Sequence, residues 1–300
     1  MTTAVAAPFR FFSLQVVRTG RVGPSLLRVT FAGDDLRAFH SDGRDQSLSL
    51  FLPHPGQSEP AVPIESGWGS PRSGDAESGG GWWQGWRELP DGVRAVMRSY
   101  TLRALRRDPD EIDIDFVLHE PAGPASRWAS RAAAGDRVVL LGPAIADNRA
   151  IRFRPPEDTD LVVVWADESA VPAASAILES LPAGIRARVW LEVPHAGDIQ
   201  DLATDADAEI TWLVREEDRA EIPHCLERVR GAPTPMALGA LREAQLPPAE
   251  RPYVWIAGES GCVKELRRHF VGERGVDRRR VTFVGYWRQG LSEEQLRETE

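Results

Sequence analysis

Cysteine and lysine are nearly missing from this chain of 300 residues. Cys225 and Cys262 are the only cysteines, they lie far apart, and neither belongs to a CxxC pair. This scarcity argues against a disulfide framework and a structural zinc site, and it favours a reducing compartment, so we expect a cytoplasmic protein. Lys264 is the only lysine, so arginine supplies the other basic side chains apart from histidine. Arginine suits flat contacts with phosphate and carboxylate, although a coding bias explains the excess more simply.

Long hydrophobic runs and an excess of positive charge are also lacking. No apolar run approaches the about 20 residues that a membrane-spanning helix needs. The opening residues, MTTAVAAPFR, lack the basic start and apolar core of a secretory signal. The formal net charge is −9, which has the wrong sign for a general nucleic-acid binder. We therefore expect no membrane insertion and no nucleic-acid partner.

The first half of the chain is typical of β structure. Apolar and β-branched runs are separated by turn signals such as Thr19-Gly20. Between residues 112 and 118 apolar side chains alternate with Asp113 and Asp115, which is the period of a half-buried strand. Such closely spaced strands predict a small antiparallel barrel. The expected strands are Phe11–Val17, Leu26–Phe31, Leu48–Leu52, Val96–Arg103, Ile112–His119 and Arg137–Leu141.

A stretch rich in proline, glycine and serine interrupts this pattern between Pro53 and Gly92. An insertion this long inside a domain is typical of a lid or of a disordered segment. It ends with Trp82, Trp83 and Trp86, which we expect to form a short helix that packs back onto the barrel, because tryptophans are rarely left in water. A contact with a flat ligand is the alternative.

The second half of the chain changes period. Strands alternate with helices there, which predicts a parallel sheet covered on both faces and gives a β-barrel plus α/β fold class. A proline-rich joint at Arg154–Asp158 divides the chain into expected domains 1–155 and 156–300. The expected strands are Asp160–Trp165, Val189–Val193, Glu209–Leu213, Tyr253–Ala257 and Val281–Tyr286, and the expected helices are Ala170–Leu181 and Val263–Val271.

The motif RSYTLR, which begins at Arg98, has the chemistry of a flavin site. Alternation along a strand places Arg98 and Tyr100 on one face and Ser99 and Thr101 on the other. A flavin needs a cation for its pyrophosphate, a flat apolar surface for its ring and a hydrogen bond near its N5 atom, and these residue types supply all three. An ordinary barrel strand with a core tyrosine fits the four residues equally well.

A second motif follows on the next strand, where DFVLH ends at His119 and Gly123 opens a helix that carries Ser126 and Trp128. The free N–H groups of a first helical turn favour a phosphate, and the Ser126 hydroxyl can add a hydrogen bond. Trp128 can stack on a ligand or pack in the core. His119 can bond to the flavin or play a purely structural part.

In order along the chain, these motifs closely resemble the siderophore-interacting protein family. Its members are cytoplasmic ferric-siderophore reductases with the plan of ferredoxin–NADP reductases. The likeness continues through ADESAVPA from Ala166, WIAGE from Trp255 and GYWR from Gly285. The resemblance implies a barrel that binds FAD and an α/β domain that binds NADH or NADPH. It also implies two one-electron steps that reduce Fe(III) to Fe(II) and thereby release iron from a siderophore.

Carried onto this sequence, the family pattern implies a set of cofactor-binding residues but no catalytic residue, because the flavin carries the electron transfer. Scattered histidines without clustered carboxylates argue against a metal held by the protein. Lys264, Arg267 and Arg268 form a cationic group that we expect to bind an anionic siderophore, with the phosphate of NADPH or plain solvent as alternatives. The family pattern assigns Arg98, Tyr100, Thr101, Val117, Leu118, His119, Ala125, Ser126 and Trp128, and related reductases place an aromatic residue near the flavin at the position of Trp287. The chemistry and positions of the residues themselves add Ser99, Gly123, Ser169 and Glu259.

Two departures from the family pattern concern the nicotinamide side. Ala166 stands where the family usually has glycine, so its Cβ is expected to narrow the loop that faces the nicotinamide. The segment after Gly142-Pro143 is not rich in glycine, and no GxGxxG motif occurs. We therefore expect weak nicotinamide binding. A general NAD(P)H:flavin or quinone reductase and a siderophore-binding module without activity remain the alternative functions, and the protein is expected to be a monomer.

Overall fold

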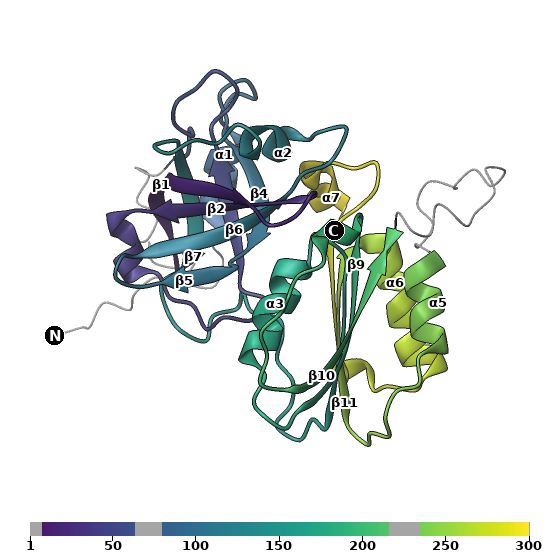
Figure 1. Ribbon diagram of the computed structural model, residues 1–300. Helices are drawn as coiled ribbons and strands as arrows, with labels where there is room; N and C mark the ends of the chain where they lie inside the picture. The colour runs from purple at the N-terminus through teal and green to yellow at the C-terminus, as the bar shows by residue number, and fades with distance from the viewer. Residues whose placement is uncertain (1–7, 64–79, 216–234, 300) are drawn as a thin grey trace. The chain divides into compact units, whose positions relative to one another are not determined.

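The computed structural model describes residues 8–63, 80–215 and 235–299. It divides the chain into two compact units (Figure 1). Unit 1 comprises Met1–Val22 and Leu26–Ile151, and unit 2 comprises Gly23–Ser25 and Arg152–Glu300. None of the helices in the described ranges has the length and hydropathy that crossing a bilayer requires.

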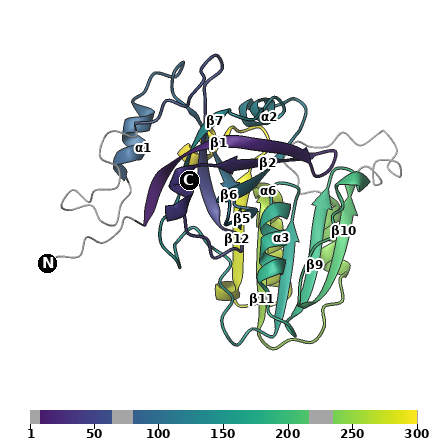
Figure 2. The same cartoon turned by 60° about the vertical axis from the view of Figure 1, so that its left-hand side comes forward.

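Unit 1 is built on an antiparallel sheet of seven strands in the order β4-β3-β7-β1-β2-β6-β5. Figure 2 shows the long β1 strand bending along this curled sheet. The predicted barrel is thus an open half-barrel with edges at β4 and β5, and β4 ends at Thr101, two residues before the end of the expected strand Val96–Arg103. The strands are β1 (Phe9–Arg21), β2 (Leu26–Ala32), β3 (Ser47–Leu52), β4 (Val96–Thr101), β5 (Ala104–Arg106), β6 (Glu111–Val117) and β7 (Arg137–Pro143).

Apolar side chains fill the inside of this curl, and part of its outer face is covered by α1 (Gly80–Arg87). Trp86 is only 2% exposed, and its ring meets Phe51 edge-on at 6.3 Å. Its Nε1 donates a hydrogen bond to the carbonyl of Ala95 at 3.1 Å. The prediction of a helix that packs back onto the sheet is confirmed for Trp86, while the side chains of Trp82 and Trp83 lie outside the described residues.

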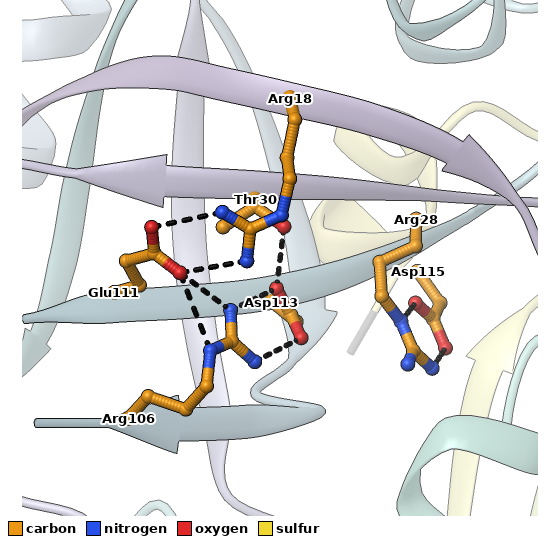
Figure 3. A network of polar contacts seen from close by, with 7 residues as sticks. All are labelled: Arg18, Arg28, Thr30, Arg106, Glu111, Asp113 and Asp115. Carbon is orange, nitrogen blue, oxygen red and sulfur yellow. Dashed lines mark hydrogen bonds and ion pairs between the residues drawn. The ribbon is translucent and has the colours of Figure 1, made fainter. Parts of the chain in front are cut away.

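The outer face of β6 differs from the prediction of a half-buried strand, because Asp113 and Asp115 are only 4% and 6% exposed. Arginines from β1, β2 and β5 lie over these acidic side chains (Figure 3). Arg28 holds Asp115 through two hydrogen bonds of 2.7 and 2.8 Å, and Arg106 holds Asp113. The partners come from other strands, so alternation within β6 could not reveal them. The remaining contacts are Arg18 with Glu111, Arg106 with Glu111 and Thr30 with Asp113.

This network predicts a stability that is sensitive to acid. The hydrogen bond from Arg18 is the main reason why the pKa of Glu111 lies below its usual value. Burial by itself would raise the pKa of Asp113, but hydrogen bonds from Arg106 and Thr30 outweigh it and lower that pKa. A carboxyl group with a depressed folded pKa stabilises the fold above its unfolded pKa, and the contribution is lost as the pH falls through the folded pKa. The free energy of unfolding should therefore fall steeply below about pH 4.

Urea unfolding of an Asp113→Asn variant tests this expectation. The variant should lose about 1–3 kcal/mol at neutral pH, because Arg106 and Thr30 lose a charged acceptor. It should also show a shallower loss of stability with acid than the wild type. Asp34→Asn is the control, because the Asp34 side chain is fully exposed. Equal acid dependence in the wild type and in Asp113→Asn would contradict the assignment.

Unit 2 contains a sheet of five parallel strands in the order β10-β9-β8-β11-β12. One face packs against α3 (Val171–Ser180) and the other against α5 (Pro235–Glu243) and α6 (Ser260–Arg268), which confirms the predicted parallel sheet with two covered faces (Figure 1). Val263, Leu266 and Phe270 are buried together as expected, although the α-helix itself ends at Arg268. The strands are β8 (Leu161–Ala166), β9 (Arg186–Val193), β10 (Asp207–Val214), β11 (Pro252–Glu259) and β12 (Val281–Trp287), and α7 (Glu293–Thr299) follows them.

The order of these strands creates a topological switch point. From β8 the chain adds β9 and β10 on one side, and it later adds β11 and β12 on the other side. The carboxyl ends of β8 and β11 therefore lie side by side, where the following segments diverge to opposite faces of the sheet. In open α/β sheets this is the position at which ligands bind.

Candidate cofactor sites

Strand β4 places the RSYT motif at an edge of the unit-1 sheet. Arg98 and Tyr100 are half-buried, Ser99 is exposed, and Thr101 is buried at the end of the strand. The Tyr100 ring packs 4.5 Å from the ring of Phe116 on β6. The motif therefore combines a half-buried cation with a flat aromatic surface, as its flavin interpretation requires.

The turn between β6 and α2 (Pro124–Ala129) brings three of the predicted residues together. The backbone N–H of His119 donates to the Ser126 hydroxyl at 3.4 Å. Gly123 precedes the helix without any side-chain cap, and a Cβ at this position would lie 3.8 Å from the His119 imidazole. Pro124 suits the first helical position, because its missing N–H has no partner there in any helix. The exposed His119 ring, Gly123 and Ser126 thus lie beside one another.

The remaining predicted residues of this region mainly pack against the sheet. Trp128 is half-buried and stacks on Phe31 at 6.3 Å with an interplanar angle of 8°. Ala125 is buried in the core cluster, and Leu118 packs against that cluster. Val117 is the last residue of β6. Of the two interpretations of Trp128, these contacts favour packing in the core.

The residues of unit 1 fit FAD by their chemistry. A phosphate calls for a cation and for N–H or O–H donors, which Arg98, Ser99 and the uncapped turn at Gly123 and Ser126 supply. A flat ring calls for an apolar surface, which the half-buried Tyr100 offers.

In unit 2 the buried carboxylate of Asp167 connects three of the predicted site residues. It follows β8 directly and is 3% exposed. It accepts hydrogen bonds from the backbone N–H of Ser169 at 3.0 Å, from the backbone N–H of Glu259 at 2.7 Å and from Nε1 of Trp287 at 2.8 Å. Ser169, Glu259 and Trp287 therefore meet at the carboxyl edge of the sheet, and the two strands at the switch point are joined there.

Sequence reasoning did not include Asp167 among the site residues. One feature of the sequence could have identified Asp167 as a site residue, because it is an acidic residue directly after a continuous apolar strand. Burial is the main reason why the pKa of Asp167 is raised to about 7, and the neighbouring Glu168 raises it further. Hydrogen bonds from Ser169 and Trp287 oppose this shift. Glu168 itself forms an ion pair of 2.7 Å with Arg215.

The cationic residues of α6 are all exposed, but two of them have neighbours that the sequence did not predict. Arg268 forms an ion pair with Glu265 at 2.7 Å, and the Arg267 guanidinium lies 4.2 Å from the centre of the Phe283 ring. The positive charge is therefore less concentrated than expected. Binding of a siderophore by Lys264, Arg267 and Arg268 stays a prediction.

The expected effect of Ala166 on the nicotinamide loop is wrong. Its side chain is fully buried in the core cluster under α3, with Val164 and Ala170 among its members. The Cβ therefore occupies core space and does not narrow an exposed loop. The expectation of weak nicotinamide binding then depends only on the missing glycine-rich turn.

Comparisons with known proteins cover both units. Residues 15–147 match the model of the siderophore-interacting FAD-binding domain, and residues 159–290 match that of the siderophore-interacting protein. The ferric vibriobactin reductase of Vibrio cholerae is 31% identical over 95% of this chain and 92% of its own length. The NADPH-dependent ferric-chelate reductase of Escherichia coli is 30% identical over 93% of each chain. The crystal structure of a siderophore utilization protein from T. fusca is 31% identical, covers 97% of each chain and has a TM-score of 0.72. The chain belongs to the siderophore-interacting protein family.

Proposed function

We propose that this protein is an FAD-dependent ferric-siderophore reductase, which reduces Fe(III) to Fe(II) and so releases iron from its chelator. The observation that carries the proposal is similarity along nearly the whole chain to proteins named as ferric reductases. Both units take part in this similarity, since the family models match residues 15–147 and 159–290.

Within the proposed domain 1–155, the FAD-binding residues are those of β4 and of the turn after β6. Arg98 and Ser99 bind phosphate, Tyr100 and Thr101 contact the ring system, and the Gly123 turn holds the rest of the pyrophosphate. When bound, FAD supplies hydride acceptance from a pyridine nucleotide and one-electron transfer to Fe(III). No side chain has to transfer a proton for the electron transfer, so the role of these residues is to bind and orient.

Within the proposed domain 156–300, NADH or NADPH binds at the switch point between β8 and β11. Ser169, Glu259 and Trp287 gather there, and parallel α/β sheets bind dinucleotides at this edge. The Glu259 carboxylate accepts from the backbone N–H of Cys262 at 2.9 Å and so caps α6. Its remaining acceptor capacity suits a ribose hydroxyl better than a phosphate.

The iron substrate is an Fe(III) complex of hard oxygen ligands. Reduction lowers the charge of the ion and weakens its hold on such ligands, so electron transfer alone is enough to release it. We propose that the protein acts as a monomer in the cytoplasm, where the ferrous product remains available. Light scattering of the purified protein tests the monomer.

Three measurements on one preparation test the proposed function. The purified protein should absorb in the flavin region and release FAD on denaturation. Anaerobic NADPH or NADH should bleach that absorbance, and a ferric chelate should restore it while an Fe(II)-specific dye develops colour. Reoxidation by a quinone but not by ferric chelates would favour a general flavin reductase. A colourless protein that still binds ferric chelates would favour a binding module.

Charge reversal at Arg267 tests the siderophore surface. An Arg267→Glu variant should reduce an anionic ferric chelate about two- to tenfold more slowly at low salt, because electrostatic steering acts through the association rate. The salt dependence should become flatter, since screening then has less attraction to remove. A neutral electron acceptor should be reduced at an unchanged rate.

Arg279→Glu is the matched control, because Arg279 is exposed elsewhere in unit 2 and pairs with Asp277. Loss of NADPH-driven reduction with retained dithionite-driven iron reduction would instead assign Arg267 to the nucleotide phosphate. If Arg267→Glu behaves like Arg279→Glu in every assay, the cationic residues of α6 are an ordinary solvated surface.

A further inference from the structure

We propose that Asp167 is the positioning residue of the nucleotide site, because its carboxylate holds the Trp287 indole and the turn after β11 in one fixed arrangement. The inference rests on the proposed function and names the residue that organises its nucleotide half. Asp167 itself need not touch the nucleotide. It acts through the three segments that it joins at the carboxyl edge of the sheet.

The hydrogen-bond pattern requires a carboxylate at this position. Oδ1 of Asp167 accepts from the backbone N–H and the hydroxyl of Ser169, and Oδ2 accepts from the backbone N–H of Glu259 and from Nε1 of Trp287. Each oxygen therefore faces a backbone donor that cannot be turned around. An asparagine has only one acceptor oxygen, so its amide group would oppose one of these two N–H groups.

The backbone of β11 is shaped around the same carboxylate. Gly258 has a φ of 148°, and a Cβ placed on it would lie 2.5 Å from the Asp167 carboxyl group. Only glycine combines this backbone conformation with such a close approach. The next residue, Glu259, donates its backbone N–H to the Asp167 carboxylate. This hydrogen bond joins β11 to the end of β8, and these are the two strands that flank the switch point.

Trp287 gains a defined orientation from this contact. The indole Nε1 is a donor only, and its bond to Asp167 fixes the ring about its side-chain torsions. Trp287 nevertheless remains 39% exposed, which leaves part of its surface available to a ligand beside the switch point. A nicotinamide dinucleotide, with its planar ring and ribose hydroxyls, has the chemistry that such a surface and the neighbouring Ser169 and Glu259 recognise.

The charged groups around Asp167 are mostly acidic. Three acidic residues lie around it: Glu168 follows it in the chain, Glu192 comes from β9, and Glu259 ends β11. Arg215, which follows β10, forms ion pairs with both Glu168 and Glu192. Burial and this acidic surrounding raise the pKa of Asp167 to about 7. Protonation near neutral pH removes acceptor capacity from the carboxylate on which these hydrogen bonds depend. Nucleotide use should therefore show an ionisation near neutral pH, with the anionic form of Asp167 as the ordered one.

The test measures nucleotide-driven flavin reduction in Asp167→Asn, in Trp287→Phe and in the double variant. Asp167→Asn should raise KM for the nucleotide about tenfold, because hydrogen bonds to a buried charge are lost, and it should flatten the pH profile of kcat/KM around neutrality. Trp287→Phe keeps a ring but removes the donor. The double variant should then be no worse than Asp167→Asn, since the two substitutions break the same contact. Near-ultraviolet circular dichroism should report the freed indole in Asp167→Asn.

Asp160→Asn is the matched control at the opposite end of β8. The Asp160 carboxylate also accepts two backbone N–H groups, from Glu250 at 2.8 Å and from Arg251 at 3.0 Å. The Asp160→Asn variant should have a lower melting temperature than the wild type but the same KM for the nucleotide and the same pH profile. The inference is overturned if the nucleotide reduces the wild-type flavin and Asp167→Asn behaves like this control. It is also overturned if Asp167→Asn fails to fold and Trp287→Phe leaves KM and the pH profile unchanged. A wild-type protein that neither nucleotide reduces would overturn the proposed nucleotide function, and this inference with it.

Discussion

An Arg98→Ala variant should bind FAD about 10–150-fold more weakly than the wild type, because a charge-assisted hydrogen bond to phosphate is worth about 1.5–3 kcal/mol. Arg98 is half-buried on β4, which pairs with β3 in an antiparallel backbone register from Ser47↔Thr101 to Leu52↔Val96. We expect this backbone pairing to keep the strand in place when the guanidinium is removed. Titration of the apoprotein with FAD, followed by quenching of flavin fluorescence, measures the change in Kd.

Two further variants define what Arg98 contributes. Arg98→Lys keeps the charge but loses the planar pair of donors, so its affinity should lie between those of the wild type and Arg98→Ala. Arg10→Ala is the control, because Arg10 is a partly exposed arginine on β1 that pairs with Asp35. Full FAD occupancy in purified Arg98→Ala would remove Arg98 from the proposed binding set.

A Trp86→Ala variant should lower the free energy of unfolding by about 3–5 kcal/mol, the usual cost of truncating a fully buried large aromatic side chain. Trp86 packs edge-on against Phe51, and Arg94 covers its ring at 4.7 Å. Truncation leaves a cavity under α1 and an unpaired carbonyl at Ala95. Chemical denaturation of the FAD-free protein measures the loss without the added stability of a bound cofactor.

Trp86→Phe separates packing from cofactor binding. It keeps most of the apolar volume and loses only the hydrogen bond to Ala95, so it should cost about 1–2 kcal/mol. Its affinity for FAD and its flavin spectrum should equal those of the wild type. A shifted flavin spectrum in this variant would show that Trp86 contacts the ring, which is the ligand interpretation of the tryptophan segment.

Local patterns in the sequence were sufficient for the two kinds of sheet. Apolar and β-branched runs between turn signals, with alternation at residues 112–118, predicted the strands of unit 1. Apolar strands followed by helical periodicity predicted the parallel sheet of unit 2. Two elements that are short or weakly patterned, β5 and α5, were not predicted from the sequence. The three residues of β5 are too few to show a period, and α5 contains a central glycine, Gly239, that weakens a helical pattern.

The flavin motifs were also accessible from the sequence, because their residues are neighbours along the chain. Arg98 to Thr101 belong to one strand, and His119 to Ser126 belong to one turn. Backbone geometry alone brings such residues together. The order of the domains, the resemblance to the family and the expected FAD-binding residues of unit 1 could therefore be inferred from neighbouring residues along the chain.

Local patterns do not show which distant side chains share a site or which acidic side chains are buried, because both depend on how the strands pair. Asp167 meets Glu259 across 92 positions and Trp287 across 120 positions, because parallel strands return their carboxyl ends to the same edge. Asp113 and Asp115 looked like the solvent face of a strand until arginines from neighbouring strands covered them. Periodicity describes one strand at a time, whereas burial and pKa depend on partners that pairing between strands supplies.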